Sequence, residues 1–147
     1  MSISTWLSNL RSRVRPKPEP AHLALGRWGE KKAESYLRKE TDLKILGRRV
    51  RVGKHDEIDL LARFNSILVV IEVKTRATEG LRPVRDAVGS KKQWRLNRAA
   101  VRYAKHLDPK PEGIRFDIVE VIGSPQQKEL KIHHIPGAFG LHKSFRV

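Results

Sequence analysis

Residues 67–74 constrain the fold more than any other part of the chain. Ile67 to Ile71 are apolar at every position, and Glu72, Val73 and Lys74 follow directly. A strand without polar alternation is covered on both faces, as in the centre of an α/β sandwich. A carboxylate and an ammonium at the end of such a strand are costly unless they are paired or hydrogen-bonded. The segment therefore predicts a central strand that ends in a polar site.

The remaining sequence supplies helices and further strands around this one. Hydrophobic periodicity predicts helices at 21–40 and 91–107, strands at 43–52, 57–64, 114–122 and 130–135, and a polar loop at 75–89. Ser90, with Gln93 three residues later, is typical of a capping box. The last dozen residues look irregular, with Pro136, Gly137 and Gly140. This order predicts an α/β fold in which a mixed sheet of about five strands is flanked by helices.

The helix at 21–40 has a stripe of small and apolar residues. They recur at spacings of three and four, so they share one face: Gly26, Gly29, Ala33, Tyr36 and Leu37. The two glycines weaken the helix but would let another part of the backbone approach closely.

Residues 1–20 differ in composition from the rest. Several arginines and one lysine stand against the single acid Glu19, and Pro16, Pro18 and Pro20 alternate with other residues. Such a segment favours an extended, solvated chain. We therefore predict a basic, disordered tail at 1–20 and one domain at 21–147.

Cysteine is absent, which excludes disulfides and thiolate metal sites. The longest strongly apolar run, 67–71, is far too short to span a bilayer. A cytoplasmic protein without a membrane partner is expected.

The chain is strongly basic. Lys and Arg number 31 against 16 Asp and Glu, giving a net charge of +15. Clustered cations displace the counterions condensed on phosphate backbones, so this balance indicates a polyanionic partner. Charge alone leaves DNA, RNA and an anionic membrane surface open.

Acidic residues fall at positions where a sheet should be buried. Glu57 and Asp59 lie two apart on one predicted strand, as Glu72 and Lys74 do on the next. The short link Asn65-Ser66 favours a hairpin between these strands, which brings Asp59 close to Glu72. Two adjacent carboxylates repel unless a cation lies between them. Mg²⁺ or Mn²⁺, held by Asp59 and Glu72, would satisfy both.

Two further residues suit such a site. Lys74 leaves the same face as Glu72 and can stabilise charge on a phosphate. Glu30 lies in the packing stripe of the first helix and can act as an outer ligand or hold a water. The alternative is a buried salt-bridge network, in which Glu72 pairs with Lys74 and Asp59 with an arginine from the loop.

Four blocks of sequence together resemble the YraN-like family of bacterial proteins, which are predicted endonucleases. The blocks are Gly26 to Glu30, Glu57 to Ala62, Ile71 to Arg76 and Arg115 to Val121. The resemblance spans roughly residues 25–139. It implies the restriction-endonuclease-like fold, also called PD-(D/E)xK, and a likeness to archaeal Holliday-junction resolvases.

This resemblance also implies roles for individual residues. Asp59 and Glu72 would be Mg²⁺ ligands, Lys74 the catalytic lysine and Glu30 an acid carried by the first helix. The family usually has Gly where this chain has Asp56. That acid would either shift the entry of the strand or add a carboxylate near the metal.

The second helix carries basic residues at helical spacing. Lys91, Arg95, Arg98, Arg102 and Lys105 form a stripe, Lys92 lies beside it, and no acid interrupts residues 90–107. Helices normally mix signs on a solvated face, so this stripe predicts contacts with phosphates. Arg76, Arg82 and Arg85, in the loop region after the strand of Lys74, could hold the scissile strand of a nucleic acid near the metal. For Trp94 we favour packing on the sheet over stacking on a base.

Other polar residues are expected to be structural. His133 and His134 are adjacent on a strand and so face opposite sides, which makes them poor joint ligands. Asp117 and Glu120 are expected to form ion pairs, and His55 to lie on the surface.

The function indicated is a Mg²⁺-dependent endonuclease that hydrolyses DNA, including branched or single-stranded forms, with DNA favoured over RNA. Resolution of branched DNA would require a homodimer. The alternative is a DNA- or RNA-binding module that retains the fold without catalysis.

Overall fold

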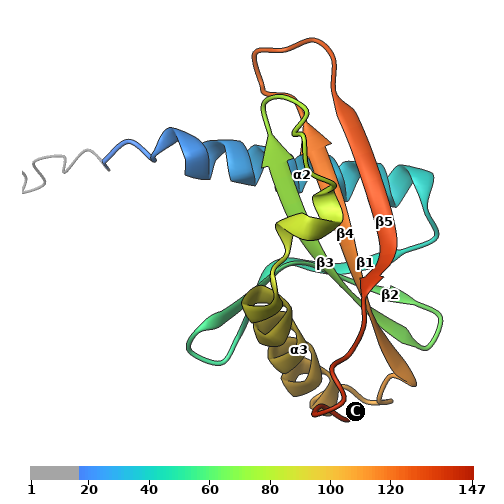
Figure 1. The fold of residues 1–147 in the computed structure, drawn as a ribbon. Coiled ribbons are helices and arrows are strands. Elements are labelled where there is room, and N and C mark those ends of the chain that lie inside the picture. The colour runs from blue at the N-terminus through green and yellow to red at the C-terminus, as the bar shows by residue number, and fades with distance from the viewer. Residues whose placement is uncertain (1–16) are drawn as a thin grey trace, which may run out of the picture.

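The computed structural model describes residues 17–147, in which five strands form one sheet and two long helices pack against it (Figure 1). The elements are α2 (Ala21–Glu40), β1 (Lys44–Val52), β2 (Asp56–Phe64), β3 (Ile67–Arg76), the 3-10 turn η1 (Val84–Ala87), α3 (Ser90–Lys105), β4 (Gly113–Ile122) and β5 (Lys131–Phe139). This confirms the predicted α/β class, and the mixed sheet is consistent with a restriction-endonuclease-like domain.

The sheet follows the order of the chain, β1-β2-β3-β4-β5. Only β3 and β4 run parallel; the other neighbouring strands are antiparallel. A parallel pair needs a long crossover connection, and here η1 and α3 form it. Consequently β3 lies in the middle of the sheet, as its uninterrupted apolar run predicted.

The two faces of β3 belong to different cores. Leu68 and Val70 pack with Leu96 and other residues of α3, whereas Val69 and Ile71 pack with residues of α2. All four strand residues are at most 1% exposed. The helices therefore cover opposite faces of the sheet, with α2 behind it and α3 in front in the view of Figure 1.

Helix α2 has the predicted bounds, and the small residues of its stripe face the sheet. Gly29, Ala33 and Leu37 are buried. A β-carbon at Gly29 would lie 1.8 Å from the Thr75 Oγ1, whereas one at Gly26 would meet nothing within 4 Å. Close approach is therefore a property of Gly29 alone, and the expectation for Gly26 was wrong.

Helix α3 differs from its prediction at both ends. Gly89 is its N-cap, and no side chain caps the first turn, so the predicted capping box is wrong. The Gln93 side-chain amide instead donates a hydrogen bond of 2.9 Å to the Val88 carbonyl. The helix ends at Lys105, two residues before the predicted end at Leu107.

Strand β5 is longer than predicted, because residues 136–139 continue it. Gly137 has φ +58° and donates its amide to the Asp117 carboxylate at 3.0 Å. Two residues later, the ring of Phe139 stacks on Phe116 at 4.9 Å. These contacts with β4 keep Pro136 and Gly137 in the sheet, although their sequence favours a turn.

The N-terminal tail falls mostly outside the described residues, which begin at 17; residues 17–20 precede α2 without regular structure. The division of the chain into a tail at 1–20 and a domain at 21–147 stays a prediction. None of the helices within 17–147 is long and apolar enough to cross a bilayer.

Candidate metal and nucleic-acid site

The β2–β3 hairpin brings Asp59 and Glu72 together. Its turn uses Asn65 at φ +51°, and its pairing runs from Phe64 opposite Ile67 to Leu60 opposite Ile71. In this register the next opposed residues are Asp59 and Glu72. The ladder stops there, and the Asp59 Oδ2 instead accepts a hydrogen bond of 2.9 Å from the Val73 amide. The hairpin therefore delivers both acids to one place, as the sequence predicted.

Strand β2 is irregular at Asp59. Ile58 packs in the core under α3, yet Leu60 packs in the core under α2, although residues two apart on a regular strand share a face. On the adjacent strand, Arg49 has φ +53° and lacks a partner in the ladder between Val50 and Arg48. This irregularity turns the Asp59 side chain out of the regular alternation of the sheet.

Glu72 is only 4% exposed and is flanked by two amines. The Nζ of Lys74 lies 3.1 Å from its Oε1, and the Nζ of Lys92, from the first turn of α3, lies 3.5 Å from its Oε2. Lys74 is thus on the same face as Glu72, as expected for residues two apart. The pairing also shows that part of the predicted alternative, a salt bridge between Glu72 and Lys74, is present.

One oxygen of Glu72 remains incompletely satisfied. Among the described residues, the buried Glu72 Oε2 and Glu30 Oε2 have no hydrogen-bond partner. Buried carboxylate oxygens without partners are costly. Both atoms belong to residues that the sequence assigned to the site.

Glu30 lies on α2, half-buried near the same end of the sheet. Burial raises the pKa of Glu30, although the charge of Arg49 opposes this. Its charge also contributes to raising the pKa of Asp59. Glu30 therefore contributes to the electrostatics of Asp59 from the helix on the other face of the sheet.

The electrostatics of Asp59 reflect a shortage of positive charge. Burial, followed by repulsion from Glu72, raises the pKa of Asp59 to about 7, although the hydrogen bond from the Val73 amide works in the opposite direction. The described residues place no arginine in an ion pair with Asp59, which was the predicted alternative. A cation between Asp59 and Glu72 would relieve this repulsion.

The donor set fits a hard divalent cation. Between residues 17 and 147, no three acidic or histidine side chains converge closely enough to enclose a metal. Mg²⁺ keeps several waters and is usually held by one or two carboxylates. Asp59 and Glu72, whose Oε2 faces Lys92 at 3.5 Å without a hydrogen bond, match that requirement, and Mn²⁺ accepts the same oxygen ligands.

One acid, Glu120, and a histidine extend the polar line across the sheet. Glu120 is opposite Lys74 in the parallel register, and its carboxylate lies 3.7 Å from Arg76 and 3.2 Å from the His133 Nδ1. The ion pairing predicted for Glu120 is confirmed. The place of Glu120 beside Lys74 was missed, although an acid between Val119 and Val121 in an apolar strand is the same signal that identified Glu72.

Asp117 faces the other side and is fully buried. Its carboxylate accepts hydrogen bonds of 2.8 Å from Arg115 and lies 2.8 Å from the His134 Nε2. Burial alone would raise the pKa of Asp117, but hydrogen bonds from His134, Arg115 and the Gly137 amide together lower it. The prediction of a structural ion pair is confirmed, and His133 and His134 do face opposite sides.

Asp56, which the sequence placed near the metal or at the strand entry, is held by α3. Arg98 donates two hydrogen bonds to its carboxylate, at 2.9 and 2.6 Å. The hydrogen bond from Arg98 is the main cause that lowers the pKa of Asp56. Arg98 therefore ties α3 to the start of β2, and its side chain is less available to a phosphate than the rest of the predicted stripe. Arg76 is likewise engaged by Glu120.

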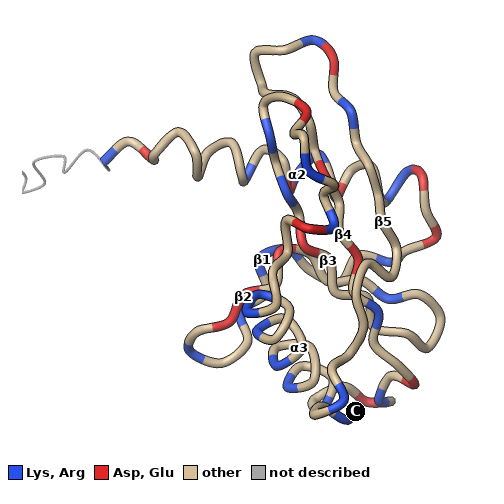
Figure 2. The backbone as a smooth tube through the Cα atoms, in the orientation of Figure 1, with Lys and Arg blue, Asp and Glu red and all other residues tan. Residues whose placement is uncertain are grey.

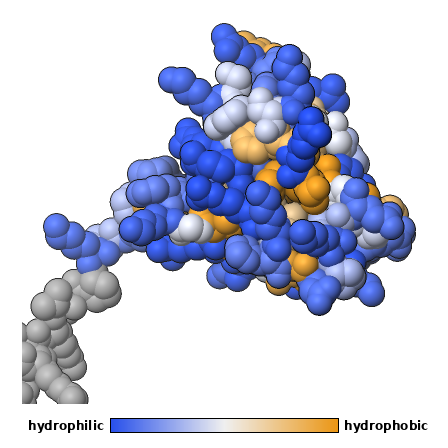
Figure 3. Space-filling model, turned by 90° about the horizontal axis from the view of Figure 1, so that it is seen from below, coloured by the Kyte–Doolittle hydropathy of each residue, from blue (hydrophilic) through white to orange (hydrophobic). Residues whose placement is uncertain are grey.

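The remaining basic residues of α3 are open to solvent. Lys91, Arg95, Arg102 and Lys105 are exposed, and Figure 2 shows positive charges recurring along the helix. Lys92 connects this surface to Glu72. Seen from below, the molecule is largely hydrophilic, with only scattered apolar patches (Figure 3).

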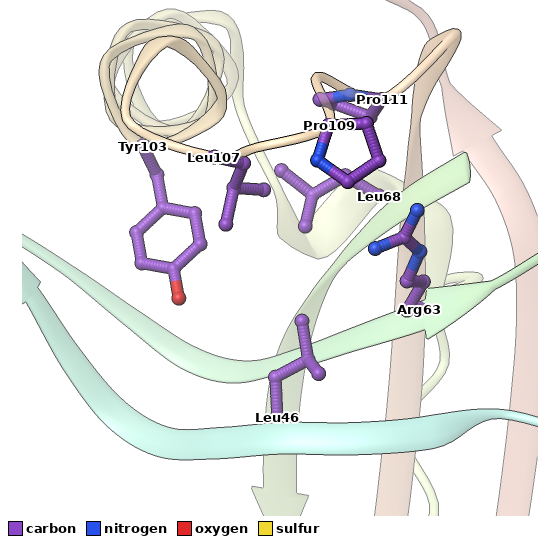
Figure 4. Close-up of a pocket in the computed structure, with 7 residues that line it drawn as sticks. All are labelled: Leu46, Arg63, Leu68, Tyr103, Leu107, Pro109 and Pro111. Atoms are coloured by element: carbon purple, nitrogen blue, oxygen red, sulfur yellow. The ribbon is translucent and has the colours of Figure 1, made fainter. Parts of the chain in front are cut away.

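A separate pocket of about 240 Å³ lies at the other end of α3 (Figure 4). Tyr103 and Leu107 border it from the helix side, Leu46 and Leu68 from the strands, and Arg63 is its one charged residue. It contains none of the acids described above. The apolar lining and the distance along β3 from Leu68 to Glu72 set this pocket apart from the candidate metal site.

Comparison with known proteins places this architecture in a family. Residues 29–121 match the model of the Uncharacterised protein family UPF0102. A UPF0102 protein of Syntrophotalea carbinolica is 40% identical over 119 residues, covering 80% of this chain and 92% of its own length. UPF0102 proteins of Bacteroides fragilis and Parafrankia sp. are each 40% identical, over 118 and 116 residues, covering 80% and 78% of this chain and 93% and 95% of their own lengths. The matched region contains Glu30, Asp59, Glu72 and Lys74, and the chain belongs to the UPF0102 family.

Proposed function

We propose that this protein is a metal-dependent endonuclease that hydrolyses phosphodiester bonds in DNA. The observation that carries the proposal is the meeting of Asp59 and Glu72 beside Lys74. Burial, followed by repulsion from Glu72, raises the pKa of Asp59 to about 7, and the buried Glu72 Oε2 lacks a hydrogen-bond partner among the described residues. Two carboxylates with these properties are more stable with a cation bound between them than in the metal-free protein.

The residues can divide the work of hydrolysis as follows. Bound Mg²⁺ or Mn²⁺ would activate a water and stabilise charge on the phosphate. Lys74, 3.1 Å from Glu72, can donate hydrogen bonds to the phosphate oxygens as negative charge builds up. Glu30, whose raised pKa favours proton uptake, can hold a water and accept its proton.

Positive charge next to this site supports nucleic acid as the substrate. Lys92 reaches Glu72, and exposed Lys91 and Arg95 continue from it along α3. Basic side chains of this kind bind phosphates regardless of sequence. We favour DNA over RNA because of the resemblance to DNA nucleases, and concerted cleavage of a branched DNA would need two copies of the chain.

The test is cleavage of a panel of labelled single-stranded, duplex and branched DNAs with Mg²⁺ or Mn²⁺. Wild type should cleave at least one of them, and Asp59→Ala/Glu72→Ala should not. Lys74→Ala should reduce cleavage while leaving metal binding in place. Lys39→Ala, an exposed change at the end of α2 outside both the acid cluster and the basic stripe of α3, is the control. Equal cleavage by wild type and the double variant would show that the assignment of Asp59 and Glu72 to the cleavage site is wrong.

A second function, a nucleic-acid-binding module without catalysis, is favoured by one observation. Lys74 and Lys92 already neutralise Glu72 in the absence of metal. Such a module would bind DNA or RNA in a salt-sensitive way without metal, and Lys74→Ala would not lower the affinity by more than other single lysine changes do. Binding that persists in a chelator, together with no cleavage of any substrate, would select this function.

A further inference from the structure

A cluster of three aromatic rings lies beside the basic surface of α3. Trp94 is 44% exposed, and its ring lies 4.6 Å from that of Phe145 and 5.4 Å from that of His142. We call Trp94, His142 and Phe145 the aromatic platform. Trp94 belongs to neither hydrophobic core, so the expectation that it packs on the sheet was wrong. A large ring left half in water, supported from one side, is available for a ligand.

The platform is held in place by buried polar contacts. The C-terminal segment returns to lie beside α3 (Figure 1), where the Asn97 Oδ1 accepts a hydrogen bond of 2.6 Å from the His142 amide. Asn97 is 1% exposed, and its amide group donates to the Gln93 carbonyl at 2.9 Å. The amide of Phe145 in turn donates to the His142 carbonyl at 2.9 Å. Ordering the rings in advance lowers the entropic cost of binding.

Cations border the exposed face of the platform. Lys91, Trp94 and Arg95, together with Ser90, line a shallow hollow of about 440 Å³. Lys91 and Arg95 are exposed, and the helix carries no acid between residues 90 and 105. Phosphates attracted to these side chains would bring the attached bases next to the ring of Trp94.

The combination of rings and cations selects a class of ligand. Proteins bind single-stranded nucleic acid with a positive groove that tracks the backbone and aromatic side chains on which bases stack. In a duplex the faces of the bases are covered by neighbouring bases. A protruding indole can therefore contact only base edges and phosphates there, and cannot stack. The platform therefore suits an unpaired base.

We propose that Trp94, supported by His142 and Phe145, is a stacking site for an unpaired base of a single-stranded nucleic acid. The proposal rests on the proposed nucleic-acid function and narrows its substrate to strands that are at least partly unpaired. Lys92, two residues before Trp94, contacts Glu72, so the first turn of α3 joins the platform to the candidate metal site. A strand with a base on Trp94 would pass its phosphates along this turn.

The test separates bases from phosphates. Fluorescence anisotropy is measured with labelled single strands of about 12 nucleotides, within the range covered by single-stranded-binding domains, in a chelator that prevents cleavage. One strand carries thymine bases, and the other has abasic units with the same phosphates. Stacking of one base predicts tighter binding of the first strand by about 5- to 100-fold.

Variants of the full chain assign this difference to a residue. Trp94→Ala should abolish the preference for the base-bearing strand while leaving the affinity for the abasic strand unchanged. Trp94→Phe should retain most of this preference, because phenylalanine also offers an aromatic ring. Arg95→Gln is the matched control, since it should lower the affinity for both strands by the same factor. A thermal melt of each variant shows whether the fold is kept. If Trp94→Ala unfolds, Trp94→Leu, which keeps an apolar side chain without an aromatic ring, takes its place and should likewise lose the preference.

Three results would overturn the proposal: equal affinity of wild type for the two strands, an equal loss of affinity for both strands in Trp94→Ala, or a preference for the base-bearing strand that survives removal of the aromatic ring at position 94. The nuclease function is tested separately, by the cleavage assay with metal. If cleavage fails there, the preference for the base-bearing strand is still expected. If neither strand binds, the nucleic-acid function fails together with the stacking site.

Discussion

Lys92 of α3 and Glu72 of β3 form an ion pair between helix and sheet, with 3.5 Å between Nζ and Oε2. Lys74 lies 3.1 Å from the other oxygen of the same carboxylate. Both oxygens of Glu72 therefore face an ammonium group before any metal binds. A divalent cation must therefore compete with these two ammonium groups for the Glu72 carboxylate, and the affinity for the metal measures this competition.

Replacing Lys92 by methionine should strengthen metal binding. Lys92→Met removes a positive charge that both occupies Glu72 and repels a cation, so the affinity for Mn²⁺ should rise by up to about fivefold, on the scale of a partly exposed ion pair. Isothermal titration with Mn²⁺ measures this. Lys105→Met, at the far end of α3, should leave the affinity unchanged; an unchanged or lower affinity in Lys92→Met would contradict competition.

Asp59 should make the metal-free protein less stable as the pH rises. Its folded pKa is about 7 against an ordinary value of 3.8, so the folded state holds a proton that the unfolded state has released. The free energy of unfolding therefore falls between about pH 4 and pH 7, and the full cost is present above pH 7. Asp59→Asn removes this contribution.

Urea unfolding in a chelator tests this dependence. Asp59→Asn should be more stable than wild type at about pH 8, and the two should converge near pH 4. Mg²⁺ added at the higher pH should stabilise wild type and not the variant. A constant difference across this pH range would mean that Asp59 does not carry the shifted pKa.

The two glycines of α2 should respond to alanine with opposite signs. Gly29→Ala places a β-carbon 1.8 Å from Thr75 Oγ1 and 2.8 Å from Thr75 Cβ, so helix or strand must move. A loss of about 1–3 kcal/mol is expected, as for overpacked cores. Gly26→Ala meets nothing within 4 Å and should gain up to about 1 kcal/mol from helix propensity. Denaturant unfolding of both variants checks the pair, and equal effects would refute the close contact.

Asp117 should be essential to the junction of β4 and β5. Asp117→Asn leaves Arg115 and His134 facing a neutral amide in a fully buried position, and a loss on the order of 3 kcal/mol is expected at neutral pH. Because the folded pKa of Asp117 is lowered, its contribution disappears as the pH falls through that pKa.

The control for Asp117 is an exposed ion pair. Glu79→Gln removes the contact of 2.9 Å with Lys131, where both side chains are about 60% exposed, and should change stability far less than Asp117→Asn does. Chemical unfolding near neutral and acidic pH compares the two. A loss in Asp117→Asn no larger than that in Glu79→Gln would show that the buried cluster is dispensable.

The sequence was sufficient where local pattern decides the structure. The uninterrupted run at 67–71 predicted a central strand, and counting back from the turn at Asn65 placed Asp59 opposite Glu72. The rotation of α3 about its own axis is not encoded locally, so the contacts of Lys92 with Glu72 and of Arg98 with Asp56 could not be predicted. The hydrogen bond from the His142 amide to Asn97 could not be predicted for the same reason, because tertiary docking of the C-terminal segment determines it.

The errors have physical causes too. Gln93 could have capped Ser90 but reaches the Val88 carbonyl instead, and Pro136 and Gly137 stay in β5 because Asp117 holds the strand there. In both cases a group outside the predicted motif takes part in the hydrogen bond: the Val88 carbonyl for Gln93, and the Asp117 carboxylate on β4 for Gly137. The short-range pattern of residues 136–139 does not reveal Asp117, because tertiary pairing of β4 with β5 brings it there.

The parallel pairing of β3 and β4 has a consequence for how such a protein can diversify. Both strands end at the same edge, where the Gly123 amide donates to the Arg76 carbonyl at 2.8 Å. The connections that leave this edge, residues 77–83 and 123–130, can change in length or sequence without displacing the strand ends that carry Glu72 and Lys74. Related chains could therefore admit differently shaped ligands over an unaltered set of acids.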